Sequence, residues 1–431
     1  LIVTFCGDSK KTIENAYLLS TKSKNSNSMA LKNNQNRTIV LPISETIYNL
    51  FINDNDFAHK TIINYIEQIP ECFPKSIING YVFNGKTRKS KKVNLKMRKI
   101  KTDNISYRIR PSFILPYQRG RTNEVANALF LMRFGVPFWA IAFVFGRNSM
   151  WWYRLFLSFS DYSIVGTTIR DPNKLPQDIL ADEHHIKIRG KKAYIATTAG
   201  SNCFLGMSAC NNADEYSLMN AYAGFKEESQ NLKPDYQPDT VNTDGWWATQ
   251  NAWKLLYPTI AVIECFLHAF IKVRDRATKK LKQHFNIAGD KIWNCYNADS
   301  KKALAQQIRR LREWTHQLDD SPMKNNILKL CKKKKRWMQH FDAPNAHRTS
   351  NMIDRLMRAM NRHAYNSQMF HGKKTESTSK NFRAFALLYN FSPSSPAARI
   401  KDKALDSPAA RLNGFTYHQN WLHNLLISSS L

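Results

Sequence analysis

The chain has 431 residues and a formal net charge of +31, because 64 lysines and arginines stand against 33 aspartates and glutamates. Its apolar fraction of 43% is ordinary for a folded protein and argues against an intrinsically disordered chain. A positive charge of this size favours polyanionic partners, of which nucleic acid is the first candidate. The seven cysteines form no CxxC pair, which argues against a disulfide framework and a zinc knuckle and suggests a reducing compartment.

The N-terminal part of the chain is predicted to be a linker followed by a basic region. Residues 20–37 are rich in Ser, Asn and Lys, so we expect a flexible N-terminal segment over residues 1–40. Residues 41–172 are expected to form a basic, mostly helical DNA-binding region. This region begins with weak helical patterns between residues 41 and 80.

A strongly basic stretch follows, with nine Lys or Arg between residues 86 and 101. One interpretation is a solvated and disordered charge run. The other is a segment that follows a phosphate backbone, because aromatic side chains flank it on both sides (Tyr81, Phe83, Tyr107, Phe113 and Tyr117). On the second interpretation, the residues that contact DNA are Lys89, Lys91 and Lys92.

Residues 125–145 are apolar and about as long as a membrane span. Arg133, Gly135 and Pro137 interrupt this stretch, so we favour short helices and expect no membrane partner. Three helices are predicted between residues 122 and 160, and the second is expected to be buried on most sides.

The turn between the second and third helices contains Arg147 and Asn148, and Arg154 follows in the third helix. Two helices joined by a tight turn that contains Gly are typical of the helix-turn-helix motif, which would present these three side chains to DNA. A helical bundle without a role in DNA binding is the alternative.

From residue 173 the pattern predicts three antiparallel strands, a helix, a strand, a helix and a strand. This is the order of the ribonuclease H-like fold, so the expected fold class is α/β with a mixed five-stranded sheet. We assign residues 173–271 and 342–372 to this core and residues 272–341 to a basic, all-helical insertion. Residues 373–431 are expected to form a C-terminal helical tail.

Three aspartates are candidates for a catalytic carboxylate set. Asp182 lies on the first predicted strand, Asp244 ends the fourth, and Asp354 lies on a helix that also carries Asn351. Parallel neighbouring strands would bring the first two together, and a helix packed on the sheet could supply the third. Converging carboxylates repel unless cations neutralise them, and two Mg²⁺ ions suit phosphodiester chemistry.

Each aspartate also has a structural alternative. Asp182 could start a strand, Asp244 could cap a turn, and Asp354 could form an i, i+4 pair with Arg358. Arg358 and Arg362 share a helix face with Asp354 and are further candidates for DNA contacts.

The segments around the three acids carry a family resemblance. ADEHHIKIRGKKAYIATTAG, VNTDGWWATQNAW and TSNMIDRLMRAMNR resemble the three acidic blocks of DDE/DDD-type DNA transposases with a ribonuclease H-like core. ECFLHAF supplies Cys265 and His268 in the CxxH arrangement of Mutator-like transposases. The third acid is Asp rather than the more usual Glu, and its rivals Glu313 and Glu376 lack the Asn-x-x-acid context.

The resemblance implies a transposase that cleaves phosphodiesters and transfers strands. Asp182 would bridge two Mg²⁺ or Mn²⁺ ions, Asp244 and Asp354 would hold one each, and the supporting residues would be Cys265, His268 and Asn351. The implied partners are transposon terminal inverted repeats, target DNA and further copies of the chain in a homodimer or higher oligomer. The implied location is the cytoplasm, in association with the nucleoid, if the chain is prokaryotic, and the nucleus if it is eukaryotic. A ribonuclease H-like nuclease and a non-catalytic helix-turn-helix regulator remain the alternatives.

Overall fold

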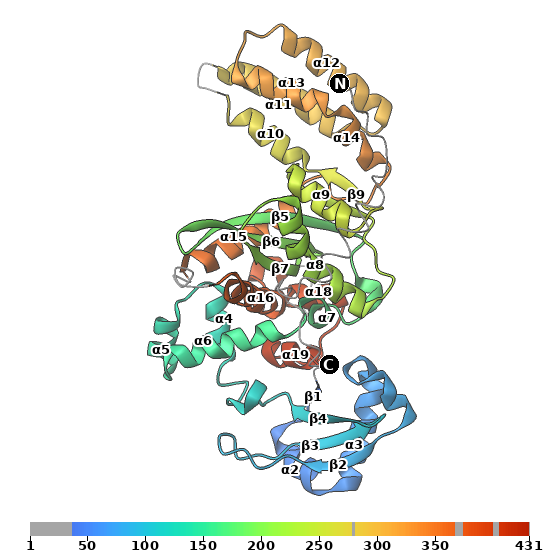
Figure 1. Ribbon diagram of the computed structural model, residues 1–431, viewed down its shortest axis with the longest axis vertical. Coiled ribbons are helices and arrows are strands. Elements are labelled where there is room, and N and C mark those ends of the chain that lie inside the picture. The colour runs from blue at the N-terminus through green and yellow to red at the C-terminus, as the bar shows by residue number, and fades with distance from the viewer. Residues whose placement is uncertain (1–36, 278–280, 367–373, 400–404, 431) are drawn as a thin grey trace, which may run out of the picture. The chain divides into compact units, whose positions relative to one another are not determined.

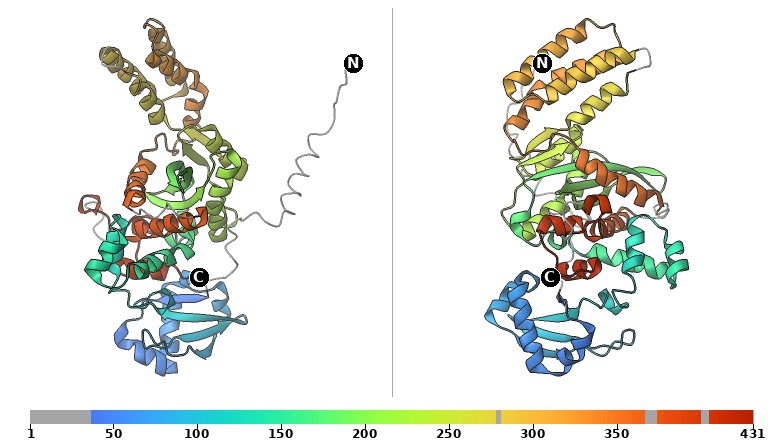
Figure 2. Two further views of the ribbon diagram at one scale, coloured as in Figure 1. Left: turned by 60° about the vertical axis from the view of Figure 1, so that its left-hand side comes forward. Right: turned by 180° about the vertical axis from the view of Figure 1, so that it is seen from behind.

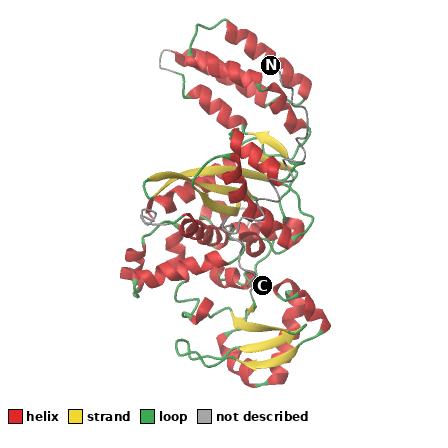
Figure 3. Cartoon of the chain, viewed as in Figure 1, coloured by secondary structure: helices red, strands yellow, loops and turns green. Residues whose placement is uncertain are grey.

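The computed structural model describes residues 37–277, 281–366, 374–399 and 405–430 (Figure 1). These residues form a mixed α/β structure with two mixed sheets, one of four strands and one of five (Figure 3). The predicted α/β class with a mixed five-stranded sheet is confirmed. The four-stranded sheet is not predicted by the sequence patterns.

The first sheet contains β1 (Thr38–Leu41), β2 (Val82–Lys86), β3 (Arg98–Thr102) and β4 (Ile105–Pro111), in the order β1-β4-β3-β2. β1 is parallel to β4, and the other neighbours are antiparallel. The helical patterns predicted between residues 41 and 80 correspond to α2 (Glu45–Asn53) and α3 (Asn55–Gln68). The flexible segment predicted for residues 1–40 is wrong at its end, where β1 begins, and residues 1–36 lie outside the described part.

The basic run at residues 86–101 contributes to this sheet, so the expectation of a mostly helical region over residues 41–172 is wrong here. Arg98 and Ile100 both point inward from β3, and Arg98 is 2% exposed. The Arg98 guanidinium donates hydrogen bonds to the carbonyl oxygens of Ile52 and Asp54, each at 2.9 Å. A cation at an inward position hides the strand alternation, which is why the sequence does not predict β3.

The three helices predicted between residues 122 and 160 are α4 (Ala126–Arg133), α5 (Phe138–Phe145) and α6 (Ser149–Leu157). The expected burial of the second helix is wrong. Trp139, Phe143 and Val144 of α5 are 69%, 87% and 68% exposed. An apolar sequence indicates a tendency to be buried. α5 stays exposed because it packs mainly against its chain neighbours α4 and α6, which cover only part of its surface. In the described part of the chain, no helix is long and apolar enough to cross a membrane.

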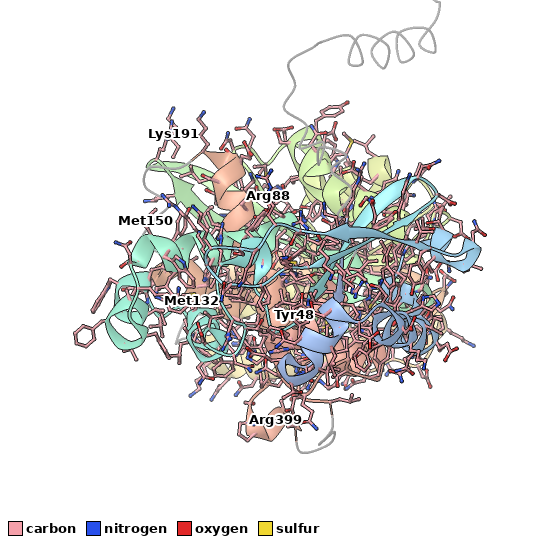
Figure 4. All side chains as sticks on the ribbon, turned by 90° about the horizontal axis from the view of Figure 1, so that it is seen from below. Tyr48, Arg88, Met132, Met150, Lys191 and Arg399 are labelled. Atoms are coloured by element: carbon pink, nitrogen blue, oxygen red, sulfur yellow. The ribbon has the colours of Figure 1, made fainter. Side chains whose placement is uncertain are left out.

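The central sheet has the order β7-β6-β5-β8-β9. β5 (Asp178–Ile188), β6 (Lys191–Gly200) and β7 (Cys203–Cys210) are antiparallel, whereas β8 (Thr240–Thr243) and β9 (Ala261–Glu264) run parallel to β5. Arg189 and Gly190 both have positive φ angles, as a two-residue hairpin turn requires. Lys191 begins β6 directly after this turn and extends away from the fold (Figure 4).

Helices cover both faces of the central sheet. One face packs against α8 (Glu215–Leu232) and α9 (Trp247–Leu256), and the other packs against α15 (Asn351–Asn366) and α16 (Thr375–Phe391). The Asn390 amide of α16 accepts a hydrogen bond from the Phe204 amide of β7 at 2.9 Å and donates one to the Phe204 carbonyl at 2.8 Å. α16, predicted to belong to a C-terminal tail, is therefore a core helix of this sheet.

The predicted helical insertion is present and has a hydrophobic core of its own. It contains α10 (Phe266–Arg274), α11 (Lys282–Tyr296), α12 (Lys301–His316), α13 (Pro322–Lys332) and α14 (Lys334–Met338). α10 to α13 run alongside one another in every view (Figures 1 and 2). The insertion begins directly after β9, a few residues before the predicted boundary at residue 272.

The remaining elements are short. The helices are α7 (Ile164–Thr168), α17 (Pro396–Arg399), α18 (Pro408–Asn413) and α19 (Trp421–Ser428). The 3₁₀ turns are Pro70–Cys72, Lys75–Asn79, Pro116–Gln118, Ser158–Asp161, Pro172–Lys174 and Gln339–Phe341.

Candidate active site at the carboxyl edge of the central sheet

Asp182 lies on β5, and Asp244 directly follows the neighbouring parallel strand β8. The β5–β8 ladder ends where Leu180 lies opposite Asn242, two residues before each aspartate. Residues two apart in a strand point to the same face, so the Asp182 side chain emerges with that of Leu180 on the side covered by α15. Asp244 lies close enough for its charge to act on the Asp182 carboxyl.

The electrostatics of Asp182 report this proximity. Burial raises the pKa of the Asp182 carboxyl to about 6, and the negative charges of Asp244 and Asp354 add to the rise. The amide of Glu183 and the charge of His268 act in the opposite direction. The charges of Asp244, directly after β8, and of Asp354 on α15 therefore both act on Asp182 at this edge, although residue 354 is far from the other two in sequence.

The chain turns sharply after Asp244. The Asp244 Oδ1 accepts a hydrogen bond from the Trp246 amide at 2.8 Å, so the turn-capping alternative holds alongside the convergence with Asp182. Gly245 has a φ angle of +90°, and a Cβ atom on it would lie 2.5 Å from Oε1 of Glu264. Only glycine fits this turn, because of both its backbone conformation and the close approach of that carboxylate.

Hydrogen bonds to the sheet fix the start of α15, which positions Asp354. The Asn242 side-chain amide of β8 donates to the His347 carbonyl at 2.6 Å, and the Phe266 backbone amide, just after β9, donates to the Arg348 carbonyl at 3.1 Å. The segment before α15 thus follows the carboxyl ends of β8 and β9. These contacts join residues 82 (348 − 266) and 105 (347 − 242) positions apart and explain how the insertion can separate the acids in sequence but not in space.

Cys265, His268 and Asp354 meet around one hydroxyl group. The Ser350 Oγ donates to Oδ2 of Asp354 at 3.0 Å and lies 3.3 Å from Nδ1 of His268. The Cys265 Sγ accepts a hydrogen bond from the Ser350 amide at 3.2 Å. The predicted CxxH pair is therefore a neighbour of the third acid, and Ser350 is a linking residue that no sequence pattern indicated.

The thiol and imidazole of this cluster influence each other. Burial raises the pKa of Cys265, but hydrogen bonding with His268 and Ser350 outweighs burial, so its pKa lies below the ordinary value. Hydrogen bonding with Cys265 raises the pKa of His268 to about 9, with further increases from the charges of Asp182 and Asp354. His268 is therefore protonated at neutral pH and carries a positive charge beside the acids.

The donor chemistry of this edge suits a divalent cation. Carboxylate oxygens are the ligands that Mg²⁺ prefers, and crowding of negative charge, as at Asp182, is what a bound cation relieves. Within the described ranges, however, no group of three or more His, Cys, Asp or Glu side chains is already arranged to hold a metal ion. The residues at this edge therefore suit a divalent cation in the type and the charge of their donor atoms.

Glu183 faces the opposite side of the sheet. Its Oε1 accepts hydrogen bonds from the Tyr222 hydroxyl and the Thr249 hydroxyl, both at 2.7 Å. Burial raises the pKa of Glu183 to about 7. This carboxyl joins β5 to α8 and α9, so its contacts are structural.

The candidate DNA contacts fall into three groups. Lys89, Lys91 and Lys92 are exposed between β2 and β3. Arg147 forms an ion pair with Glu124 at 3.2 Å and lies over the Trp151 ring at 4.3 Å. The other predicted DNA contacts are also exposed, namely Arg154 on α6 and Arg358 and Arg362 on α15. Asn351, predicted to support the acids, is exposed at the start of α15.

Three of the predicted or rival residues have local roles. Asn148 caps α6, since its Oδ1 accepts a hydrogen bond from the Met150 amide at 2.7 Å. Met150 itself is 46% exposed at the edge of this region (Figure 4). Glu313 and Glu376 form i, i+4 pairs with Arg309 and Lys380 at 3.5 and 3.3 Å, as surface residues do.

No family model matches the chain, and no curated protein matches it.

Proposed function

We propose that the chain is a DDD-type DNA transposase, which cleaves phosphodiesters and joins strands at transposon ends with divalent metal. The observation that carries the proposal is the parallel pairing of β5 with β8, which leaves Asp244 near Asp182, together with the charges of Asp244 and Asp354 that raise the pKa of Asp182. A net charge of +31 supports a nucleic-acid substrate.

The strand order of the central sheet supports a ribonuclease H-like core. Three antiparallel strands are followed by two strands parallel to the first, and β5 lies at the centre. In such a core, the acids within β5, directly after β8 and on α15 belong to one site. The helical insertion between β9 and α15 is consistent with the same proposal.

Within the proposed site, the carboxylates of Asp182, Asp244 and Asp354 would hold two Mg²⁺ or Mn²⁺ ions. Bound there, the ions would activate the attacking oxygen and stabilise the leaving one. His268 would present its positive charge to a phosphate or position the incoming strand. Ser350 would hold Asp354 and His268 in place through its hydroxyl. The exposed lysine and arginine side chains between β2 and β3, around α6 and on α15 would contact the DNA backbone.

A cleavage assay with matched variants tests the proposal. The substrate is a supercoiled plasmid that carries the inverted repeats flanking the gene, with Mg²⁺ or Mn²⁺ added. Asp182→Asn and Asp244→Asn should abolish nicking and strand transfer while DNA binding is retained. Asp235→Asn, in the exposed turn between α8 and β8, is the control and should retain both activities.

The same assay separates the alternatives. Cleavage without any joining of 3′-hydroxyl ends, and without dependence on inverted repeats, would instead support a ribonuclease H-like nuclease. DNA binding with no metal-dependent cleavage by the wild-type chain would support a non-catalytic regulator. Cleavage retained by either Asp→Asn variant would remove that residue from the mechanism.

A further inference from the structure

A cavity of about 280 Å³ lies beside α15, and arginines dominate its lining. Two lining residues come from the end of α4 and the residue after it, one comes from α16, and the others come from α15 at helical spacing. The residues that matter for the argument are Arg133, Phe134, Arg355, Arg358, Arg362 and Tyr389. Residues 355, 358 and 362 share one helix face, because i, i+3 and i+7 positions align along a helix.

Among residues 37–430, outside the gaps in the described ranges, no carboxylate lies within 4.0 Å of any of the four guanidinium groups. Arg355 donates to Oδ1 of Asn202 at 3.0 Å, and Arg133 donates to the Pro393 carbonyl at 2.7 Å. Both partners are neutral, so no carboxylate of the described residues compensates the positive charge of the cavity. Burial lowers the pKa of Arg133, and the nearby charges of Arg362 and Arg411 lower it further.

Aromatic rings orient part of this cluster. The Arg133 guanidinium lies 4.6 Å from the centre of the Tyr389 ring and 5.2 Å from that of Phe134. The Arg362 guanidinium also lies over the Phe134 ring, 6.0 Å from its centre. Rings that hold guanidinium groups in fixed planes lower the entropic cost of binding an anion.

We propose that this cavity is a binding site for a phosphate monoester. A monoester carries a charge of about −1.5 to −2 at neutral pH and offers three acceptor oxygens, whereas a phosphodiester carries a single charge. Guanidinium groups bind phosphate through paired N–H donors, so several arginines around one dianion match both its charge and its geometry. The cavity volume is just below the usual range for small-molecule sites, which suits a phosphate with part of the group attached to it.

The site is independent of the acidic edge in its chemistry, although one helix carries both. Two of its arginines, Arg358 and Arg362, were expected from sequence to contact DNA. Arg133 and Arg355 were not. The ligand could be the phosphorylated 5′ end of a nucleic-acid strand or a free nucleotide, and the two share the same terminal group.

Binding measurements without divalent metal test the inference. The probes are adenosine 5′-monophosphate, adenosine, and one oligonucleotide prepared with either a 5′-phosphate or a 5′-hydroxyl. The monophosphate should bind at least tenfold more tightly than adenosine, and Arg358→Gln should weaken that binding at least tenfold. Arg358→Lys should recover part of the loss, because it restores the charge but not the paired donors.

Controls separate this site from the acidic edge and from general electrostatics. Asp182→Asn should leave monophosphate binding unchanged, and so should Lys174→Gln, which removes an exposed charge elsewhere. Arg355→Gln provides a second variant, with thermal unfolding used to verify that each variant is folded. A preference for the 5′-phosphorylated strand over the 5′-hydroxyl strand would assign the ligand to a strand end, and its absence would assign it to a nucleotide. Equal binding of adenosine and its monophosphate, or equal losses in Lys174→Gln and Arg358→Gln, would overturn the inference.

Discussion

Neutralising Asp182 should make the metal-free protein more stable at neutral pH. The pKa of this carboxyl is raised from 3.8 to about 6, so the folded state holds its proton more tightly than the unfolded state does. The contribution of Asp182 to the free energy of unfolding is therefore most favourable below about pH 4 and falls as the pH rises to about 6. The shift corresponds to about 3 kcal/mol at most, and partial exposure of the side chain reduces this to about 1–3 kcal/mol.

Urea unfolding at a series of pH values from about 4 to 8 measures this effect. Asp182→Asn should match the wild type near pH 4 and exceed its free energy of unfolding by about 1–3 kcal/mol at pH 7. Added Mg²⁺ should stabilise the wild type by mass action but not Asp182→Asn. Asp235→Asn should track the wild type at every pH. An Asp182→Asn protein that is less stable than the wild type at pH 7 would refute the reasoning, because it would mean that the ionised carboxylate is stabilised by its surroundings.

Three further variants test contacts around the same edge. Glu183→Gln should raise the free energy of unfolding at pH 8 by about 1–3 kcal/mol, because the pKa of Glu183 is raised to about 7, and should leave the stabilisation by Mg²⁺ intact. If Mg²⁺ no longer stabilises that variant, Glu183 belongs to the metal site. Gly245→Ala should cost about 2 kcal/mol or more in urea unfolding, given its positive φ angle and the approach of Glu264. The matched control Gly224→Ala, in a helix with open space around it, should instead gain about 0.5–1 kcal/mol, and equal effects would contradict this account. Glu264→Gln should lower the free energy of unfolding by about 1–3 kcal/mol and speed proteolysis of the insertion, because the buried carboxylate pairs with two cations of the insertion. Unchanged stability and proteolysis would show that these ion pairs contribute nothing.

The central sheet could be predicted because its signals are local. Each strand from β5 to β9 has its own β-like run, and the turns between them carry glycine or other residues suited to positive φ angles. The approach of Asp244 to Asp182 follows from the parallel pairing of β5 with β8 in that order. The position of Asp354 could be inferred only from its helix and the family resemblance, because the contacts that fix it join distant parts of the chain.

The failures arise where a side chain contradicts the pattern around it. Arg98 occupies an inward position in β3, so the sequence of this strand shows a run of charges and not the alternation of a strand. α5 is apolar but exposed, since burial depends on what packs against a helix and not on its own sequence. The arginine cavity joins α4 to α15, and no local pattern links Arg133 with residues more than 200 positions later.

α15 fixes the distance between Asp354 and the arginines that it contributes to the cavity. Asp354 and Arg358 are separated by one helical turn, about 6 Å along the axis, and this spacing is set by hydrogen-bonded backbone and not by a loop. Any shift of the helix along the sheet must therefore carry the acid and the arginines together by the same amount. A change that slides α15 would displace Asp354 and the arginines together. Only a break within the helix could change the position of one without the other.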